Sequence, residues 1–127
     1  MSKQAVFTEK APAAIGPYNQ AILHQNTLFV SGQIPIDPSS GKLIEGDRVK
    51  ETRQCLENIK HILTEAGFGI DQIVKSSIFL TSMDDFATVN EVYGSFFEGC
   101  TAPARETVAV AALPKGAHVE ISVIAMR

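Results

Sequence analysis

The spacing of apolar residues identifies one long amphipathic helix in the middle of the chain. From about Val49 onward, apolar and small residues recur every three or four positions, which is the period of a helix with one buried face. The stripe consists of Val49, Thr52, Leu56, Ile59, Leu63 and Ala66, widened by Cys55 and Ile62. Asp47 is placed to cap this helix at its N-terminus and Gly67 to end it, so the pattern predicts a helix over about 49–66.

A second stripe with helical spacing lies nearer the C-terminus. It consists of Phe86, Val89, Tyr93, Phe96 and Phe97. Asp84 or Asp85 can cap this helix, and Gly99 can close it. Asn90 borders its apolar face, where a structural hydrogen bond to a neighbouring strand is the commoner role for such a residue.

The other apolar segments have the length and composition of β-strands. The expected strands cover residues 18–23, 28–34, 73–80, about 105–112 and about 119–124. The Pro/Gly turn at 113–116 is expected to join the last two strands as a hairpin. The order of these elements predicts an α+β sheet with two crossover connections.

The last two strands carry apolar residues on both faces. Val108 and Val110 alternate with Ala109 and Ala111, so neither face of this strand is polar. Two helices can cover only one face of the sheet, and an apolar face of this kind is rarely left in contact with water on a monomer. We therefore expect a homo-oligomer whose subunits bury the uncovered faces and bring distant residues together across clefts.

Length and charge narrow the classes of protein to which the chain can belong. Its 127 residues suit one domain spanning 1–127. The net charge of −3, without a run of Lys and Arg, argues against a nucleic-acid partner. No signal segment follows Met1 and no run of about 18 apolar residues occurs, so we expect a cytoplasmic protein with no membrane contact and with Cys55 and Cys100 reduced. No CxxC, HExxH or phosphate-loop pattern occurs, so we expect no metal or nucleotide site.

Arg105 and Glu120 are charged residues within the otherwise apolar final strands. A charge in such a strand is costly unless it is paired or solvated. The guanidinium of Arg105 can bind a carboxylate through two parallel hydrogen bonds, and Glu120 can hold or deprotonate a water. The alternatives are an arginine paired with a surface carboxylate and a glutamate facing solvent on an edge strand. Together the two residues predict a pocket for a small carboxylic acid.

The hairpin determines how far apart the two charges are expected to lie. With the turn centred on Pro114–Lys115, Ala109 faces Glu120, and Arg105 lies about 13 Å further along the strand at roughly 3.3 Å per residue. This separation suits a ligand and a water between the two side chains. A shift of one residue in register would put the charges on opposite faces of the sheet.

Other residues are candidates for lining the same pocket. Gly32 interrupts a strand, which indicates either a bulge or a close approach of a ligand to the backbone. Ser31 offers a hydroxyl beside it. Tyr18 is either a core aromatic residue with its hydroxyl at the rim or a group that brings this hydroxyl to a ligand. Thr107 shares the strand parity of Arg105 and can point into the same cavity.

Five segments spread over nearly the whole chain match a known sequence pattern in the expected order. They are Ala11–Tyr18, Ser31–Pro35, Asp85–Asn90, Pro103–Lys115 and Val119–Ile121. With these segments the chain resembles the RidA/YjgF family of reactive-intermediate deaminases, which act on enamines and imines.

This resemblance implies a fold, an assembly and a reaction. The fold would be chorismate-mutase-like, with a mixed sheet of about six strands, two helices on one face, and a homotrimer with clefts between subunits. The reaction would be hydrolysis of 2-aminoacrylate, 2-iminobutanoate and related 2-imino acids to 2-oxo acids and ammonia, without metal or cofactor. By motif, Arg105 would bind the substrate carboxylate and Glu120 would position and activate the water. The cleft would be lined by Tyr18, Ser31, the backbone of Gly32, and Asn90.

The chain departs from familiar relatives at two positions. Thr107 stands where many bacterial members have cysteine, so no cysteine nucleophile is available there. Ala102 replaces the more frequent aromatic residue before Pro103, which bears on substrate preference. The alternative functions are a non-catalytic protein that binds or senses 2-oxo acids, a ribonuclease that acts on messenger RNA and inhibits translation, and a chaperone.

Overall fold

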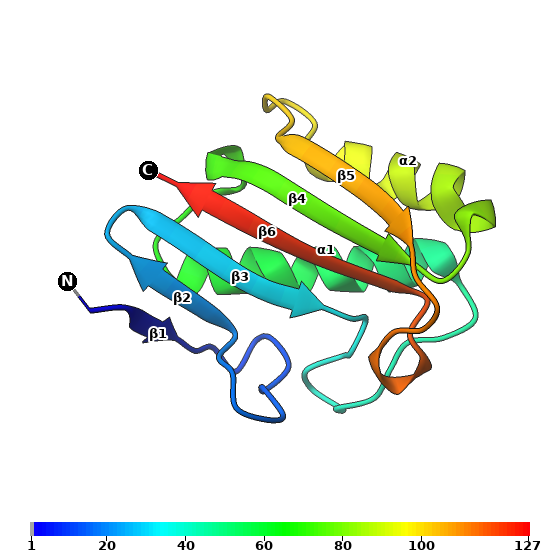
Figure 1. The fold of residues 1–127 in the computed structure, drawn as a ribbon, viewed down its shortest axis with the longest axis horizontal. Helices are drawn as coiled ribbons and strands as arrows, with labels where there is room; N and C mark the ends of the chain where they lie inside the picture. The colour runs from blue at the N-terminus through cyan, green and yellow to red at the C-terminus, as the bar shows by residue number, and fades with distance from the viewer. Residues whose placement is uncertain (1) are drawn as a thin grey trace.

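The computed structural model describes residues 2–127, in which one sheet carries both α-helices on the same face (Figure 1). The sheet has six strands in the order β1-β2-β3-β6-β4-β5. Their bounds are Gln4–Val6, Ala21–His24, Thr27–Gln33, Ile73–Leu80, Ala104–Ala109 and Val119–Met126 for β1 to β6. Neighbouring strands are antiparallel except β4 and β5, which are parallel. The predicted mixed sheet with two helices on one face is confirmed.

The long helix, α1 (Arg48–Glu65), forms where the apolar stripe predicts it. Asp47 caps it, because its carboxylate accepts hydrogen bonds from the backbone N–H groups of Val49 and Lys50 at 2.9 and 3.3 Å. At the other end the chain leaves the helix at Gly67, whose φ of 80° favours glycine. The apolar face of α1 packs into the core beneath β3 and β6.

The second helix, α2 (Phe86–Phe96), begins differently from the prediction. Asp85 occupies the predicted N-cap position, but its side chain makes no capping hydrogen bond. The hydroxyl of Ser82 instead accepts a hydrogen bond from the backbone N–H of Asp84 at 3.1 Å, at the start of a short 3₁₀ turn. The carboxylate of Asp85 accepts a bond from Nε of Arg48 at 3.0 Å, which joins the first turns of the two helices.

The predicted hairpin between the last two strands is wrong, because β4 lies between β5 and β6. β5 pairs in parallel with one side of β4, and β6 pairs antiparallel with the other side. The segment 110–118 therefore passes around the end of β4, and its Pro/Gly residues form a 3₁₀ turn at Pro114–Gly116 within that crossing. Figure 1 shows this connection, coloured orange, beyond the end of the sheet.

The N-terminal part of the sheet contains a short edge strand, β1, that the apolar pattern did not predict. β2 begins later than predicted, so Tyr18 lies in the loop before it. The buried side chain of Gln20 fixes this loop. It accepts a bond from the N–H of Thr8 at 2.7 Å and donates to the carbonyls of Thr8, Ala11 and Pro12 at 3.0, 3.2 and 2.9 Å.

The face of the sheet opposite the helices is open and carries large apolar side chains. Phe29, Val108 and Met126 lie on it and are 48%, 42% and 49% exposed. The predicted face without a helix over it is therefore present, but it is only partly apolar, because Lys75, Ser77 and Glu106 also lie on it and Lys75 pairs with Glu106 at 2.8 Å. No helix among residues 2–127 combines the length and hydrophobicity needed to cross a membrane.

Candidate functional site

Glu120 and Gly32 meet where β6 runs beside β3. The register between these strands shifts between Val30 and Gln33, so β3 bulges at Ser31–Gly32. A Cβ atom on Gly32 would overlap the carboxylate of Glu120. Gly32 is thus both part of a bulge and a point of close approach, although the approaching group is a side chain of the protein itself.

The surroundings of Glu120 alter its acidity. β6 is a central strand, so the interpretation of Glu120 as a residue on an edge strand is wrong. Burial raises the pKa of Glu120 above its ordinary value of 4.5. A carboxylate whose pKa lies closer to neutrality is a stronger base, which suits a group that takes a proton from water.

A pocket of about 230 Å³ lies beside Gly32. It is lined by residues of the loop 12–15, by Tyr18, Gln20 and Gly32, by residues 33, 34 and 36, and by Pro114 and Lys115. Tyr18 is 53% exposed, and its hydroxyl accepts a long bond of 3.4 Å from the N–H of Ile15. Ser31 lies outside this lining, because its hydroxyl donates to the carbonyl of Asn19 at 2.6 Å and holds the loop against β3.

Lys115 is the charged residue in the lining of this pocket, and the sequence reasoning missed it. Its φ of 58° is in the left-handed region, which is costly for a residue with a side chain. The sequence places Lys115 in the Pro/Gly turn, and a turn of this kind predicts only a connection between strands. Among residues 2–127, no three His, Cys, Asp or Glu side chains converge where they could hold a metal ion.

Arg105 lies on the other side of the sheet, against α2. Its Nη1 donates to Oδ1 of Asn90 at 2.7 Å, and its guanidinium carbon lies 5.0 Å from the ring centre of Tyr93 and 5.9 Å from that of Phe86. Among residues 2–127, Arg105 forms no salt bridge with a carboxylate. One amide and two aromatic rings therefore orient the guanidinium and leave N–H donors for a ligand.

Thr107 faces the same side of β5 as Arg105. Its Oγ1 is buried and has no hydrogen-bond partner within residues 2–127. The hydroxyls of Ser76 and Tyr93 are buried without a partner in this part of the chain in the same way, so three such costly groups lie on the Arg105 side of the sheet. Arg105, Asn90 and Thr107 thus form one group of neighbouring residues, and Glu120, Gly32 and Tyr18 form another.

Within one chain, the two groups lie on opposite faces of the sheet. Arg105 pairs with Ser76 of β4, whereas Glu120 pairs with Phe79, three residues further along β4. Because this offset is an odd number of residues, the two side chains point to opposite faces of the sheet. The offset along the strands, combined with the two strand spacings from β5 across β4 to β6, separates the two residues by about 14 Å. Ser76 is buried beneath the helices, while Phe79 belongs to the open face. The predicted single pocket between Arg105 and Glu120 on a hairpin is therefore wrong.

Comparison with known proteins places the chain in a family. Residues 8–127 match the family described as Endoribonuclease L-PSP. The chain belongs to this family, the RidA/YjgF proteins. The resemblance found in the sequence is therefore confirmed.

Individual RidA/YjgF proteins are similar to the chain over nearly its whole length. A mouse protein named 2-iminobutanoate/2-iminopropanoate deaminase is 47% identical over 98% of this chain and 92% of its own. A protein of the conserved Rid family from Yersinia pestis is 51% identical to this chain. The two structures superpose with a TM-score of 0.97 over 99% of this chain and 100% of the Yersinia protein. TdcF from E. coli, whose crystal structure contains bound serine, is 43% identical, with a TM-score of 0.94 over 98% of both chains.

Proposed function

We propose that this RidA/YjgF protein hydrolyses 2-imino acids, such as 2-iminobutanoate and the imine form of 2-aminoacrylate, to 2-oxo acids and ammonia. The observation that carries the proposal is an oriented guanidinium with free donors, found in the same small protein as a half-buried glutamate of raised pKa. The mouse relative named as a deaminase supports the reaction. The serine bound to TdcF supports a site for a small molecule with a carboxylate.

Arg105 would bind the carboxylate of the substrate. Asn90 holds one side of the guanidinium at 2.7 Å, and Tyr93 lies against its face. The remaining N–H groups form a planar fork that matches the two oxygens of a carboxylate. The hydroxyl of Thr107, buried without a partner within residues 2–127, would donate a hydrogen bond to the substrate carboxylate or to a water held with it.

Glu120 would act as the general base. It takes a proton from a water while the oxygen of that water bonds to the imine carbon, and it then gives this proton to the nitrogen, which forms the carbinolamine. Glu120 next takes the hydroxyl proton of the carbinolamine and passes it to the nitrogen as the C–N bond breaks, so that ammonia leaves and the 2-oxo acid remains. An imine is already electrophilic, so orientation of substrate and water together with one acid–base group can supply the acceleration.

The site would be completed by a second copy of the chain. Arg105 and Glu120 lie on opposite faces of one sheet, so a small molecule cannot contact both within one chain. We propose a homotrimer in which the pocket beside Gly32 and Tyr18 in one subunit meets the group around Arg105 in the next. The apolar side chains of the open face, such as Phe29, support burial between subunits.

A coupled assay tests the reaction. A serine or threonine dehydratase generates the enamine, and the release of the 2-oxo acid is followed with and without this protein. We expect acceleration by the wild type and none by Arg105→Ala, whose oligomer should persist. Arg53→Ala is the matched control, because Arg53 is exposed on α1. No acceleration by the wild type rejects the proposal, and full activity of Arg105→Ala removes this residue from the site.

The same assay separates catalysis from simple binding. A protein that only binds or senses 2-oxo acids would keep its affinity and its function in Glu120→Gln, because the charge on Arg105 holds the ligand. Under the proposed mechanism, Glu120→Gln binds a 2-oxo acid but does not accelerate hydrolysis. Calorimetric titration with pyruvate, run beside the coupled assay, measures both properties on one preparation.

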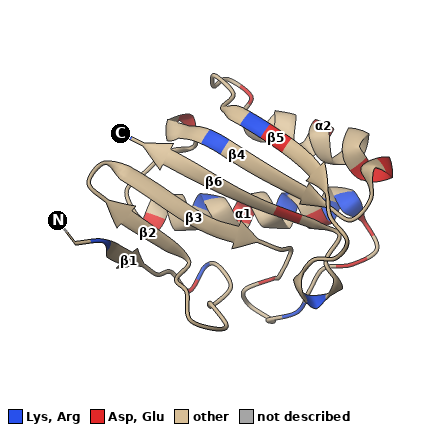
Figure 2. Cartoon of the chain, viewed as in Figure 1, with Lys and Arg blue, Asp and Glu red and all other residues tan. Residues whose placement is uncertain are grey.

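Ribonuclease activity is a second candidate, because the matching family carries that description. Figure 2 shows Lys and Arg of the described residues spread over several elements and mixed with Asp and Glu, and the net charge is −3. A stripe of positive charge, which favours binding of an RNA backbone, is not visible there. RNA cleavage that persists in highly purified protein and disappears in Arg105→Ala would favour this candidate instead.

A further inference from the structure

A charged side chain that the proposed reaction does not use is buried in the first turn of α1. The side chain of Glu51 is 0% exposed. Its Oε2 accepts bonds from Nη1 of Arg48 at 2.9 Å and from the N–H of Asp47 at 3.2 Å, and its Oε1 lies 3.3 Å from Nδ1 of His118. An ionised carboxylate only accepts, so Nδ1 of His118 is the donor. Arg48 also donates to Asp85 at 3.0 Å.

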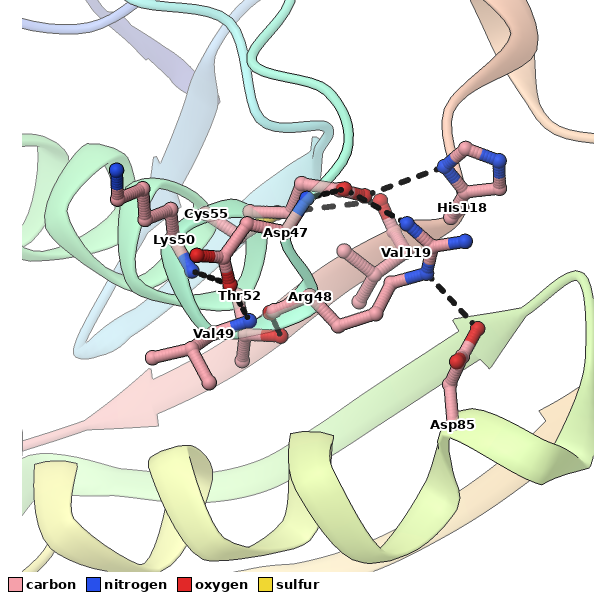
Figure 3. A network of polar contacts seen from close by, with 10 residues as sticks. Asp47, Arg48, Val49, Lys50, Thr52, Cys55, Asp85, His118 and Val119 are labelled. Atoms are coloured by element: carbon pink, nitrogen blue, oxygen red, sulfur yellow. Dashed lines mark hydrogen bonds and ion pairs between the residues drawn. The ribbon is translucent and has the colours of Figure 1, made fainter.

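These contacts connect α1 with the segment that leads into β6. Figure 3 shows Arg48 and His118 directed toward the same place at the start of α1, with Asp85 on the far side of Arg48. One turn along α1 from Glu51, Sγ of Cys55 lies 3.9 Å from the carbonyl oxygen of Val119. Side chains four residues apart on one helix face therefore contact two consecutive residues, 118 and 119.

The acidity of the Cys55 thiol depends on its burial and on two nearby carboxylates. Burial raises the pKa of the Cys55 thiol, and the negative charges of Glu120 and Glu51 raise it further. Glu51 contacts His118 from the helix side of the sheet and Glu120 follows two residues later on the open face, so the start of β6 connects the two glutamates.

The position of β6 determines where the carboxylate of Glu120 lies. The N–H of Thr81 donates to the carbonyl of His118 at 3.2 Å, and Leu80 pairs with Val119, so this segment is also held by β4. The carboxylate of Glu120 occupies the space that the missing side chain of Gly32 leaves. A small displacement of β6 would move the carboxylate out of this space and away from the water that Glu120 would activate in the proposed reaction.

We propose that Glu51 is a positioning residue, which sets the place of the Glu120 carboxylate through His118 and so controls the rate of the chemical step. This inference rests on the proposed function. Arg105 lies on β5, separated from β6 by β4, and none of its contacts involves Glu51. Glu51 is connected to the partners of Arg105 only indirectly, through Arg48, Asp85 and α2, and the bond from Nε of Arg48 to Asp85 does not require Glu51. We therefore expect turnover to depend on the Glu51 contacts much more strongly than substrate binding does.

Steady-state kinetics of Glu51→Gln test the inference in the coupled assay. Glutamine keeps the volume of the side chain but removes the negative charge of Glu51, which both His118 and Arg48 contact. We expect kcat to fall about tenfold, because a small misplacement of a catalytic group has effects of this size or larger, while KM stays unchanged. Glu57→Gln is the matched control, since Glu57 is on the same helix with its side chain 47% exposed, and wild-type kinetics are expected for it.

Variants of His118 test the same contact from its other side, so the inference can be judged even if Glu51→Gln does not fold. His118→Ala removes the donor at a side chain that is 35% exposed and should lower kcat as Glu51→Gln does. His118→Asn places an amide N–H near the position of Nδ1 and should restore kcat. A wild type that accelerates hydrolysis, combined with an unchanged kcat in His118→Ala, would overturn the inference. The inference would also be overturned if KM of His118→Ala or Glu51→Gln rose as kcat fell, or if His118→Asn did not restore kcat. A wild type without acceleration would overturn the proposed function and this inference with it.

Discussion

Gly32 determines where the carboxylate of Glu120 can lie, because the space of a missing Cβ atom is the space that the carboxylate fills. Gly32→Ala should therefore displace the carboxylate and lower kcat by up to about a hundredfold, with KM little changed. Gly94→Ala is the matched control, since no atom of the described residues would contact its new Cβ atom. Alanine in α2 at this position should stabilise the protein by about 0.5–1 kcal/mol. Wild-type kcat in Gly32→Ala would contradict the dependence of Glu120 on this space.

The raised pKa of Glu120 predicts opposite effects on activity and on stability. Burial disfavours the charged carboxylate, so its cost to stability appears as the pH rises through the raised pKa and is absent below the ordinary pKa. Glu120→Gln should thus be inactive yet melt at a higher temperature than the wild type at pH 8. Thermal denaturation from pH 4 to pH 8 measures this difference, which should disappear toward the acidic end. A lower melting temperature of Glu120→Gln at pH 8 would contradict it.

The same group sets the acidic limit of the proposed activity. A general base works only when ionised, so kcat/KM of the wild type should fall as the pH drops through the raised pKa of Glu120 in the protein without substrate. The midpoint is expected above 4.5, the ordinary value for a glutamate. A pH profile of kcat/KM, with the dehydratase kept in excess at each pH, gives this midpoint. A midpoint at or below the ordinary value would indicate that another group limits the reaction.

At the scale of elements, α1 shows what a local pattern can predict. The stripe and the two end signals, Asp47 and Gly67, placed this helix almost as observed, because periodicity and capping depend only on neighbouring residues. The stripe did not reveal the buried Glu51, since a charged residue on a helix normally faces water. Its burial depends on Arg48 and on His118, and His118 lies 67 residues away in the sequence.

The last two strands show what a local pattern cannot predict. A Pro/Gly turn between two apolar segments is the usual signal of a hairpin, and the segments themselves are strands. The choice of partner, however, was decided by β4, which pairs with both of them. Because β4 lies between β5 and β6, Arg105 and Glu120 point to opposite faces of the sheet, whereas the predicted hairpin placed them on the same face. The wrong strand pairing therefore led to the wrong geometry for the site.

The N-cap of α1 allows a direct test at this scale. Asp47→Ala removes the acceptor for two backbone N–H groups and should lower the free energy of unfolding by about 1 kcal/mol. Asp84→Ala is the matched control and should change the free energy by less than about 0.5 kcal/mol, because Asp84 is exposed. Urea denaturation measures both values. Equal losses in the two variants would show that the cap adds no stability of its own.

At the scale of the whole molecule, the sheet separates the two groups of site residues. The sequence named Arg105, Asn90, Glu120, Gly32 and Tyr18 individually, because a charge, an amide or a glycine in an apolar element is conspicuous. It did not group them correctly, because the grouping depends on strand order and, in the proposed trimer, on a second chain. No periodicity within one sequence contains that information.

The open apolar face gives a prediction for the proposed trimer. Phe29→Lys places a charge on this face, where Phe29 is 48% exposed in the single chain. We expect sedimentation analysis to find trimers for the wild type and monomers for Phe29→Lys, because an unpaired charge in an apolar interface is costly. The monomers should also lack deaminase activity. Lys60→Glu on α1 is the matched control and should remain trimeric and active. A monomeric wild type that is fully active would contradict the shared site.

The placement of Arg105 and Glu120 on opposite sides of one sheet also has a genetic consequence. Subunits with Arg105→Ala and subunits with Glu120→Gln would each be inert alone, yet a mixed trimer can combine the intact arginine of one kind with the intact glutamate of the other. Random co-assembly would leave about a quarter of the clefts with both groups. Two dead alleles expressed in the same cell should therefore complement each other, and so should the two proteins when they are unfolded and refolded together.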